Sequence, residues 1–238
     1  MNPLGFALAA ALGNVAGALA VVQGERRSLR FIDACLAFGA GFMLAVVTLG
    51  MLPEVLRDSP GAAAYVLAGY LAVHLAQHVF TPHFHFGEET HRVSAAAGIS
   101  ALLGLTLHTF FDGVAIASGF LVSGRLGVLL FLAVLLHKLP EGVTIASVMV
   151  AGGQGRGRAI GAAAVLGVAT VLGVVLTEQV VPLARHGLAL SAGVTLYVAA
   201  SNLVPELQAR RGGLTATAFF GGALAFFVAE RLLEGWIR

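Results

Sequence analysis

The sequence predicts an all-α integral membrane protein with eight transmembrane helices. Of its 238 residues, 58% are hydrophobic and only 11% are charged, and the mean hydropathy is +0.91. Soluble domains carry about 25% charged residues, so this composition indicates a chain embedded in lipid. We expect one transmembrane domain spanning residues 1–238, in contact with the lipid bilayer, as a multi-pass protein of the cell membrane.

Eight segments are long and apolar enough to cross a bilayer, which takes about 20 residues for a hydrocarbon core of about 30 Å. In chain order they cover residues 3–22, 31–56, 60–80, 94–122, 126–151, 158–181, 186–208 and 214–235. The first lacks the basic start of a secretory signal peptide, so we keep it as a span. The connections are short and leave little room for a soluble domain.

The arginines in the connections predict the orientation. Eight of them follow odd-numbered spans: Arg26, Arg27, Arg30, Arg92, Arg156, Arg158, Arg210 and Arg211. Five lie on the opposite side: Arg57, Arg125, Arg185, Arg231 and Arg238. Because basic residues favour the cytoplasmic side, both termini are predicted outside. The formal net charge is only +2 and the arginines are scattered over these short loops, so the charge distribution does not indicate a nucleic-acid partner.

Glycine is abundant, with 31 residues, many of them inside the spans. Small residues let membrane helices approach closely, so a tightly packed bundle is expected, and glycine-rich outer helices leave room for a homodimer. The single cysteine, Cys35, excludes an intrachain disulfide, and we interpret it as a small buried hydrophobe.

One motif occurs twice, in spans four and five. The segments LHTFFDGVAIAS and LHKLPEGVTIAS start 29 residues apart, and each contains His-x-x-x-acid-Gly. Residues four apart share a helix face, so His108 lies next to Asp112, and His137 next to Glu141. A charged side chain at mid-membrane costs roughly 2.5–3.5 kcal/mol, which favours a functional site.

A weaker repeat links spans two and seven. AGFMLAVVTLGMLPEVL and AGVTLYVAASNLVPELQ start 152 residues apart and align Pro53 with Pro205 and Glu54 with Glu206. Successive spans cross the membrane in opposite directions. The span numbers within each pair, two with seven and four with five, differ by an odd number, so the two members of a pair also run in opposite directions. The two pairs therefore predict inverted repeats, with spans 1–3 related to 6–8 and span 4 to span 5, and a substrate site near the bilayer midplane.

Glu54 and Glu206 follow the two prolines of this repeat. With the termini outside, Glu54 falls near the outer end of span two and Glu206 near the inner end of span seven. Two interpretations stay open: the carboxylates attract cations at the mouths of a pathway, or they are wetted helix ends.

Imidazole nitrogen and carboxylate oxygen together suit zinc, iron or manganese, whereas calcium requires more oxygens. Two neutral histidines and two carboxylates would leave a divalent ion formally neutralised, as a low-dielectric site requires. A hydrogen-bonded network without metal is the alternative; two copies on adjacent antiparallel helices favour the metal. Pro140 frees the carbonyl of Leu136 and should kink span five, and that carbonyl is available to an ion or a water.

The connection between spans three and four, residues 81–93, is a short polar loop on the predicted cytosolic side. It contains TPHFHFGEETHR, with His83, His85 and His91, and it follows His74 and His78 at the inner end of span three. Two interpretations stay open: a segment that receives or senses released metal, or a solvated loop with incidental histidines.

HTFFDG and HKLPEG resemble the fourth- and fifth-helix signatures of the ZIP family of divalent-metal transporters. The resemblance implies import of zinc, or of iron, manganese, cobalt or cadmium, into the cytoplasm, with spans one, four, five and six around the pathway. Its metal ligands correspond to His108, Asp112, His137 and Glu141. The segment GFMLA is similar to a methionine-bearing part of the family, which adds Met43 as a weak fifth ligand or as an ordinary core methionine.

Three positions depart from the family's two-metal pattern: Thr109, Lys138 and Thr170 stand where further ligands are expected. We hypothesise a single-metal site in which Lys138 replaces the second ion and pairs with Glu141 or Asp112. In the rival arrangement Lys138 snorkels away from the site.

A divalent-cation transporter without a cofactor, and not an enzyme, is therefore the leading hypothesis. A membrane-embedded metalloenzyme is an alternative, because a metal with an open position activates water, but the chain contains no HExxH. A channel-like pore and a metal sensor with the same site are further alternatives.

Overall fold

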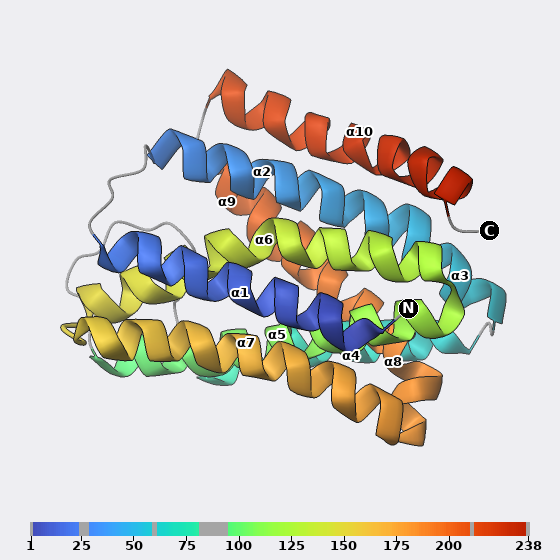
Figure 1. Ribbon diagram of the computed structural model, residues 1–238, viewed down its shortest axis with the longest axis horizontal. Coiled ribbons are helices and arrows are strands. Elements are labelled where there is room, and N and C mark those ends of the chain that lie inside the picture. Colours follow the sequence, from blue (N-terminus) through green and yellow to red (C-terminus); the bar gives the residue numbers. More distant parts are fainter. Residues whose placement is uncertain (1, 24–28, 59–60, 81–94, 210–211, 237–238) are drawn as a thin grey trace.

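The computed structural model describes residues 2–23, 29–58, 61–80, 95–209 and 212–236, and within these ranges every regular element is a helix (Figure 1). The elements are α1 (Pro3–Val22), α2 (Leu29–Ala45), η1 (Val46–Met51), α3 (Leu52–Asp58), α4 (Ala62–Phe80), α5 (Ala95–Val122), α6 (Gly124–Ala151), α7 (Arg156–Gln179), α8 (Val181–Leu196), η2 (Tyr197–Leu203), α9 (Val204–Ala209) and α10 (Gly213–Trp236). The predicted all-α class is confirmed.

Seven helices among the described residues are long and apolar enough to span a membrane: Pro3–Val22, Asp33–Arg57, Ala62–Val79, Ala101–Val122, Gly124–Ala151, Arg156–Gln179 and Gly213–Glu234. The segment expected at 186–208 corresponds to α8, η2 and α9 in direct succession and is not among the seven. Eight crossings therefore stay a prediction. Both ends of the chain lie at the same end of the bundle, as an even number of crossings requires (Figure 1).

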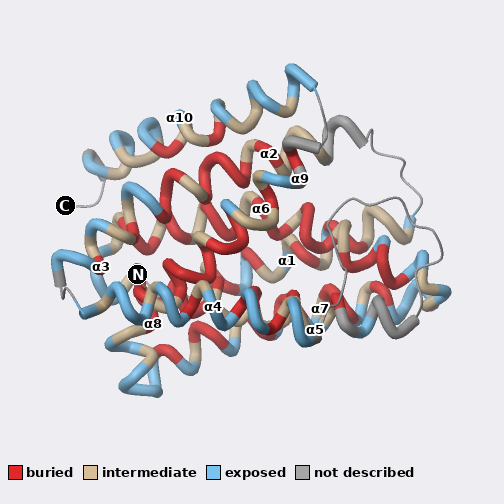
Figure 2. Tube along the Cα trace, turned by 180° about the vertical axis from the view of Figure 1, so that it is seen from behind, coloured by how far each residue is buried: buried red, intermediate tan, exposed pale blue. Residues whose placement is uncertain are grey.

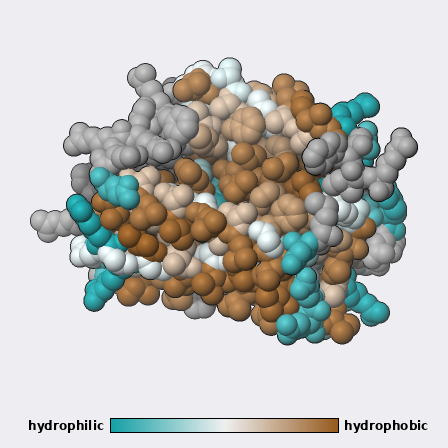
Figure 3. Space-filling model, in the orientation of Figure 1, coloured by the Kyte–Doolittle hydropathy of each residue, from teal (hydrophilic) through white to brown (hydrophobic). Residues whose placement is uncertain are grey.

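The surface has the distribution of a membrane protein. Apolar side chains cover its flank, while hydrophilic residues gather at the two ends of the bundle (Figure 3). The peripheral helices α4 and α10 have few buried residues (Figure 2), and large apolar side chains such as Leu67, Leu75, Phe220 and Leu224 are turned outward. Since water would make such exposure costly, this flank is the part of the protein that faces lipid.

Reciprocal glycine contacts hold the helices together in four pairs. A Cβ atom placed on any of these glycines would collide with backbone atoms of the partner helix. The pairs are Gly17 and Gly142 between α1 and α6, Gly113 and Gly173 between α5 and α7, Gly41 and Gly222 between α2 and α10, and Gly69 and Gly193 between α4 and α8. The helices therefore touch backbone to backbone, as expected where small residues replace side-chain packing.

Four of these helices form a closed ring. Helix α1 packs on α6 and α7, and α5 packs on the same two helices. Gly113 and Gly142 are the glycines of the two histidine motifs, so each motif helix is pressed against a helix outside the motif pair: α5 against α7, and α6 against α1. The motif side chains consequently lie inside this ring.

Two π-helical segments interrupt the long helices, and each is followed by a proline. Segment η1 lies just before Pro53 and η2 just before Pro205, at matched positions of the weaker sequence repeat. A proline has no backbone N–H and its ring clashes with the carbonyl four residues earlier. A wider π turn on the N-terminal side relieves that clash without breaking the helix.

The Gly17 contact yields a stability prediction. In Gly17→Ala the new methyl group meets the Leu139 carbonyl and lies 2.8 Å from the Val143 amide nitrogen, so overpacking should destabilise the protein by about 1–3 kcal/mol. Unfolding of purified protein in detergent measures this. The control is Gly161→Ala, whose methyl group meets nothing within 4 Å and should be neutral or stabilising. Equal effects of the two substitutions would contradict the role of the close contact.

Candidate metal centre

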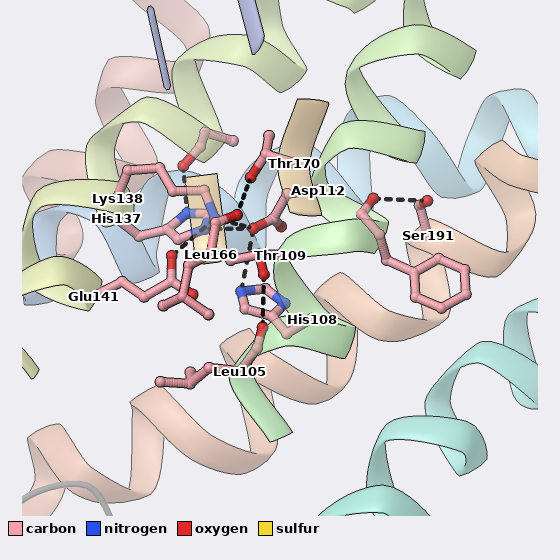
Figure 4. A network of polar contacts seen from close by, with 12 residues as sticks. Leu105, His108, Thr109, Asp112, His137, Lys138, Glu141, Leu166, Thr170 and Ser191 are labelled. Carbon is pink, nitrogen blue, oxygen red and sulfur yellow. Dashed lines mark hydrogen bonds and ion pairs between the residues drawn. The ribbon is translucent and has the colours of Figure 1, made fainter. Parts of the chain in front are cut away.

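The two histidine motifs meet inside the ring. His108 and Asp112 lie one turn apart on α5, while His137, Lys138 and Glu141 lie on α6, and none of the five is more than 6% exposed. Their side chains point toward one another from the two helices (Figure 4). The structure therefore brings together the residues that the duplicated motif singled out.

One carboxylate oxygen is the point of convergence. Oδ2 of Asp112 lies 2.7 Å from Nζ of Lys138, 3.2 Å from Nε2 of His137 and 3.5 Å from Nε2 of His108. Each of these three side chains directs a nitrogen at the same oxygen. Asp112 is therefore the centre of the network rather than the partner of its own helix's histidine alone.

The tautomer of His137 is fixed by its own helix. Its Nδ1 lies 2.7 Å from the carbonyl oxygen of Ala133, and because a carbonyl only accepts, Nδ1 donates. In a neutral imidazole the lone pair is then on Nε2, the nitrogen that faces Asp112. Two acceptors facing each other at 3.2 Å are an unfavourable pair, which the ammonium of Lys138, 2.7 Å from the same Asp112 oxygen, offsets. A carbonyl that orients an imidazole in this way is typical of metal-binding histidines.

Three potential ligands lie close together: one atom from each of His108, Asp112 and His137 falls within 4.8 Å of the others. Glu141, expected as the fourth ligand, lies next to this group and is connected to it through Lys138. Its Oε2 accepts from Nζ of Lys138 at 2.8 Å, while its Oε1 is buried and has no hydrogen-bond partner. Nδ1 of His108 is likewise buried without a partner.

Lys138 is the only lysine of the chain and is completely buried. Its ammonium group bridges the two carboxylates at 2.7 Å and 2.8 Å. Two buried carboxylates without a cation would carry a large desolvation penalty. The lysine thus compensates part of their charge, and it points into the site.

Thr109 and Thr170 lie beside the network with fully buried side chains. Their hydroxyl groups donate to carbonyls one turn earlier on their own helices, at 2.8 Å to Leu105 and 3.3 Å to Leu166 (Figure 4). Both hydroxyl protons are thereby satisfied within the helix.

Met43 is 1% exposed and belongs to an apolar cluster that includes Ala40, Val198, Ala199 and Leu203. The polar contacts around Asp112 do not involve it. The carbonyl of Leu136, freed by Pro140, faces Gly39 of α2, where an added Cβ would lie 3.4 Å from the oxygen.

The predicted mouth residue Glu54 pairs with Arg57 at 3.1 Å on the same helix. Glu206 lies in α9, but its side chain is outside the described residues. His74 and His78 are exposed on α4 and their rings are 4.1 Å apart, with Nδ1 of His78 2.8 Å from the His74 carbonyl oxygen.

His83, His85 and His91 all lie outside the described residues.

Sequence reasoning missed Asn14 of α1. Its side chain is completely buried, and with the amide nitrogen turned toward α6 it donates to Oε2 of Glu141 at 3.2 Å and to the Lys138 carbonyl at 2.6 Å. In the opposite orientation the amide oxygen would face only acceptors. The available signal was an asparagine inside an apolar span, between two glycines four apart, Gly13 and Gly17.

A family model described as ZIP zinc transporter matches residues 85–228, more than half of the chain and both histidine motifs. The sequence matches none of the curated proteins with which it was compared.

The lysine bridge yields a prediction for the chain without added metal. Lys138→Met leaves two buried carboxylates uncompensated and should lower the free energy of unfolding by about 3–5 kcal/mol. Adding Asp112→Asn in the same chain should recover part of the loss, because one of the two charges is then gone. Denaturant unfolding in detergent with a chelator present measures both changes.

The matched control is Arg125→Met, which removes a cation from a half-exposed pair with Glu234 at 3.1 Å. That change should cost no more than about 1 kcal/mol. A Lys138→Met loss no larger than the Arg125→Met loss would show that the buried bridge does not stabilise the fold.

Proposed function

Because the chain belongs to the ZIP zinc transporter family, a family of divalent-metal transporters, we propose that it carries zinc across the cell membrane into the cytoplasm. Iron, manganese, cobalt and cadmium are further substrates that the same nitrogen and oxygen ligands accept. The observation that supports this most is the lone pair on Nε2 of His137, directed at the point where His108 and Asp112 converge.

We propose that the metal ion is bound by His108, Asp112, His137 and Glu141. Two imidazole nitrogens and two carboxylate oxygens make a four-coordinate set of the kind zinc prefers. The unpartnered Oε1 of Glu141 supports this assignment, since a buried carboxylate oxygen without a partner is costly unless a cation is bound.

We propose further that one ion is bound, not two, and that the ammonium of Lys138 takes the place of a second. It spans the two carboxylates as a bridging cation would. Thr109 and Thr170 offer only neutral hydroxyl oxygens, whose protons are donated to their own helices, where a second divalent ion would require imidazole or carboxylate ligands.

The proposed architecture has eight crossings, inverted repeats and both termini outside. Matched contacts support the repeats: Gly113 and Gly142, 29 residues apart, each press a motif helix against a neighbour, and Gly41 and Gly193, 152 residues apart, do the same in the second pair. The π-helical segments before the two matched prolines support the same relation.

Other residues complete the proposed pathway. Glu54 and Glu206 would attract cations at its two mouths, Met43 would join as a weak ligand, and the histidines at the inner side would receive the released ion: His74, His78, His83, His85 and His91.

Transport is tested by uptake of Zn²⁺ into sealed proteoliposomes. The native chain should take up the metal, and His108→Ala and Glu141→Ala should each reduce uptake by about 10-fold or more, because each removes a ligand from the site. Size-exclusion profiles and thermal unfolding check that the variants fold. Folded native protein that shows no metal-dependent uptake would contradict transport and favour a sensor or a metalloenzyme.

The single-site proposal is tested by titration of purified protein with Zn²⁺. Native protein should bind one high-affinity equivalent per chain, and Lys138→Asp should bind two, because it exchanges a cation for a ligand. Because Lys138 is the sole lysine, ¹⁵N-lysine labelling gives a single side-chain signal. This signal should shift on addition of Zn²⁺ if the carboxylate partners of Lys138 bind the metal. Binding of two high-affinity Zn²⁺ equivalents by the native chain would disprove the proposal that Lys138 replaces a second ion.

A further inference from the structure

We propose that Asn14 is a positioning residue of the metal site, which holds Glu141 so that one of its oxygens is presented to the ion. The inference rests on the proposed role of Glu141 as a ligand and assigns the residue that controls its orientation. Asn14 belongs to neither histidine motif, and it comes from the N-terminal helix, more than 120 residues away from Glu141 in the sequence.

The position of Asn14 is set by the tightest contact between α1 and α6. Without a side chain at Gly142, the backbone of α6 lies directly against the backbone of Asn14, and a Cβ there would collide with the Asn14 carbonyl. On α1, a Cβ on Gly17 would collide with the Leu139 carbonyl, and a Cβ on Gly13 would lie 3.0 Å from Cβ of Lys138. The amide of Asn14 is thereby carried into the helix interface beside the site, where water does not replace it.

The two amide hydrogens have distinct partners. One is donated to the Lys138 carbonyl at 2.6 Å, which fixes the amide against the backbone of α6, and the other to Oε2 of Glu141 at 3.2 Å. An anchored amide has little freedom to rotate. The second hydrogen is therefore directed at a fixed point, and Glu141 is oriented against a rigid donor rather than a mobile one.

The two oxygens of Glu141 are thereby differentiated. Oε2 accepts from both Asn14 and Lys138, whereas Oε1 is buried and has no partner. Because Oε2 accepts two hydrogen bonds, Oε1 is the oxygen of Glu141 that is left to coordinate a metal ion. Lys138 divides its ammonium hydrogens between Asp112 at 2.7 Å and Glu141 at 2.8 Å, so Asn14 is the second donor that defines the orientation of Glu141. Residues that orient ligands in this way govern metal affinity although they never touch the ion.

The test compares the affinity of purified chains for Zn²⁺ by competition with a chromophoric chelator. Asn14→Ala removes the donor, and Asn14→Leu removes it while keeping a side chain of similar size. Both should raise the Kd about 10- to 100-fold with one equivalent still bound. The matched control is Thr177→Val, which removes a fully buried hydroxyl on α7 that bonds only its own helix; its Kd should equal that of the native chain.

A second readout separates positioning from folding. Co²⁺ bound to the native site has an absorption spectrum that reports its ligand geometry, and this spectrum should change in Asn14→Leu and stay unchanged in Thr177→Val. Native affinity and spectrum in both Asn14 variants, or equal losses in the Thr177 control, would overturn the inference. If the native chain itself binds neither Zn²⁺ nor Co²⁺, the proposed function fails instead.

Discussion

Two carboxylates that face each other inside an apolar bundle require a cation between them, and Lys138 provides it. Its ammonium lies within 2.8 Å of both Asp112 and Glu141. This contact joins α5 to α6, so the rest of the ring must keep the two helices at a fixed separation. The backbone contacts of Gly113 with α7 and of Gly142 with α1 do this from outside. The glycine contacts outside the motif pair thus hold α5 and α6 at the separation that the lysine bridge between them requires.

The histidines fit this arrangement unequally. His137 is oriented by the Ala133 carbonyl, whereas the Nδ1 of His108 is buried without a partner. One imidazole is therefore held in a ligand-ready tautomer by its own helix, while the other is free to adopt whichever tautomer the ion demands. The two candidate ligands on neighbouring helices therefore differ in how firmly the protein orients them.

The helices and the central residues were predictable from sequence because each depends on local pattern. Apolar length located the seven described helices that can span a membrane, and four-residue spacing placed His108 beside Asp112. The contact of His137 with Asp112 joins two helices, and local spacing does not specify it. The role of Asn14 was not predictable in this way, since it depends on which helix α1 packs against and at what rotation. The surroundings of Met43 were not predictable either: it packs in an apolar cluster with residues of η2 and α9, a contact that no local pattern specifies.

The turn types were likewise beyond the sequence. Pro53 and Pro205 leave a carbonyl one turn earlier without its helical donor, and a kink, a break or a π turn would each be compatible with that loss. The observed π-helical segments keep the helices continuous through both prolines, an outcome decided by packing on either side.

A cation that is covalently part of the chain differs from a bound one in a respect that matters when metal is scarce. A chelator cannot extract the ammonium of Lys138, and no competing ion can exchange with it. The fold therefore keeps part of its internal charge compensation in metal-starved cells, when a protein that relied on a second bound ion would have lost it.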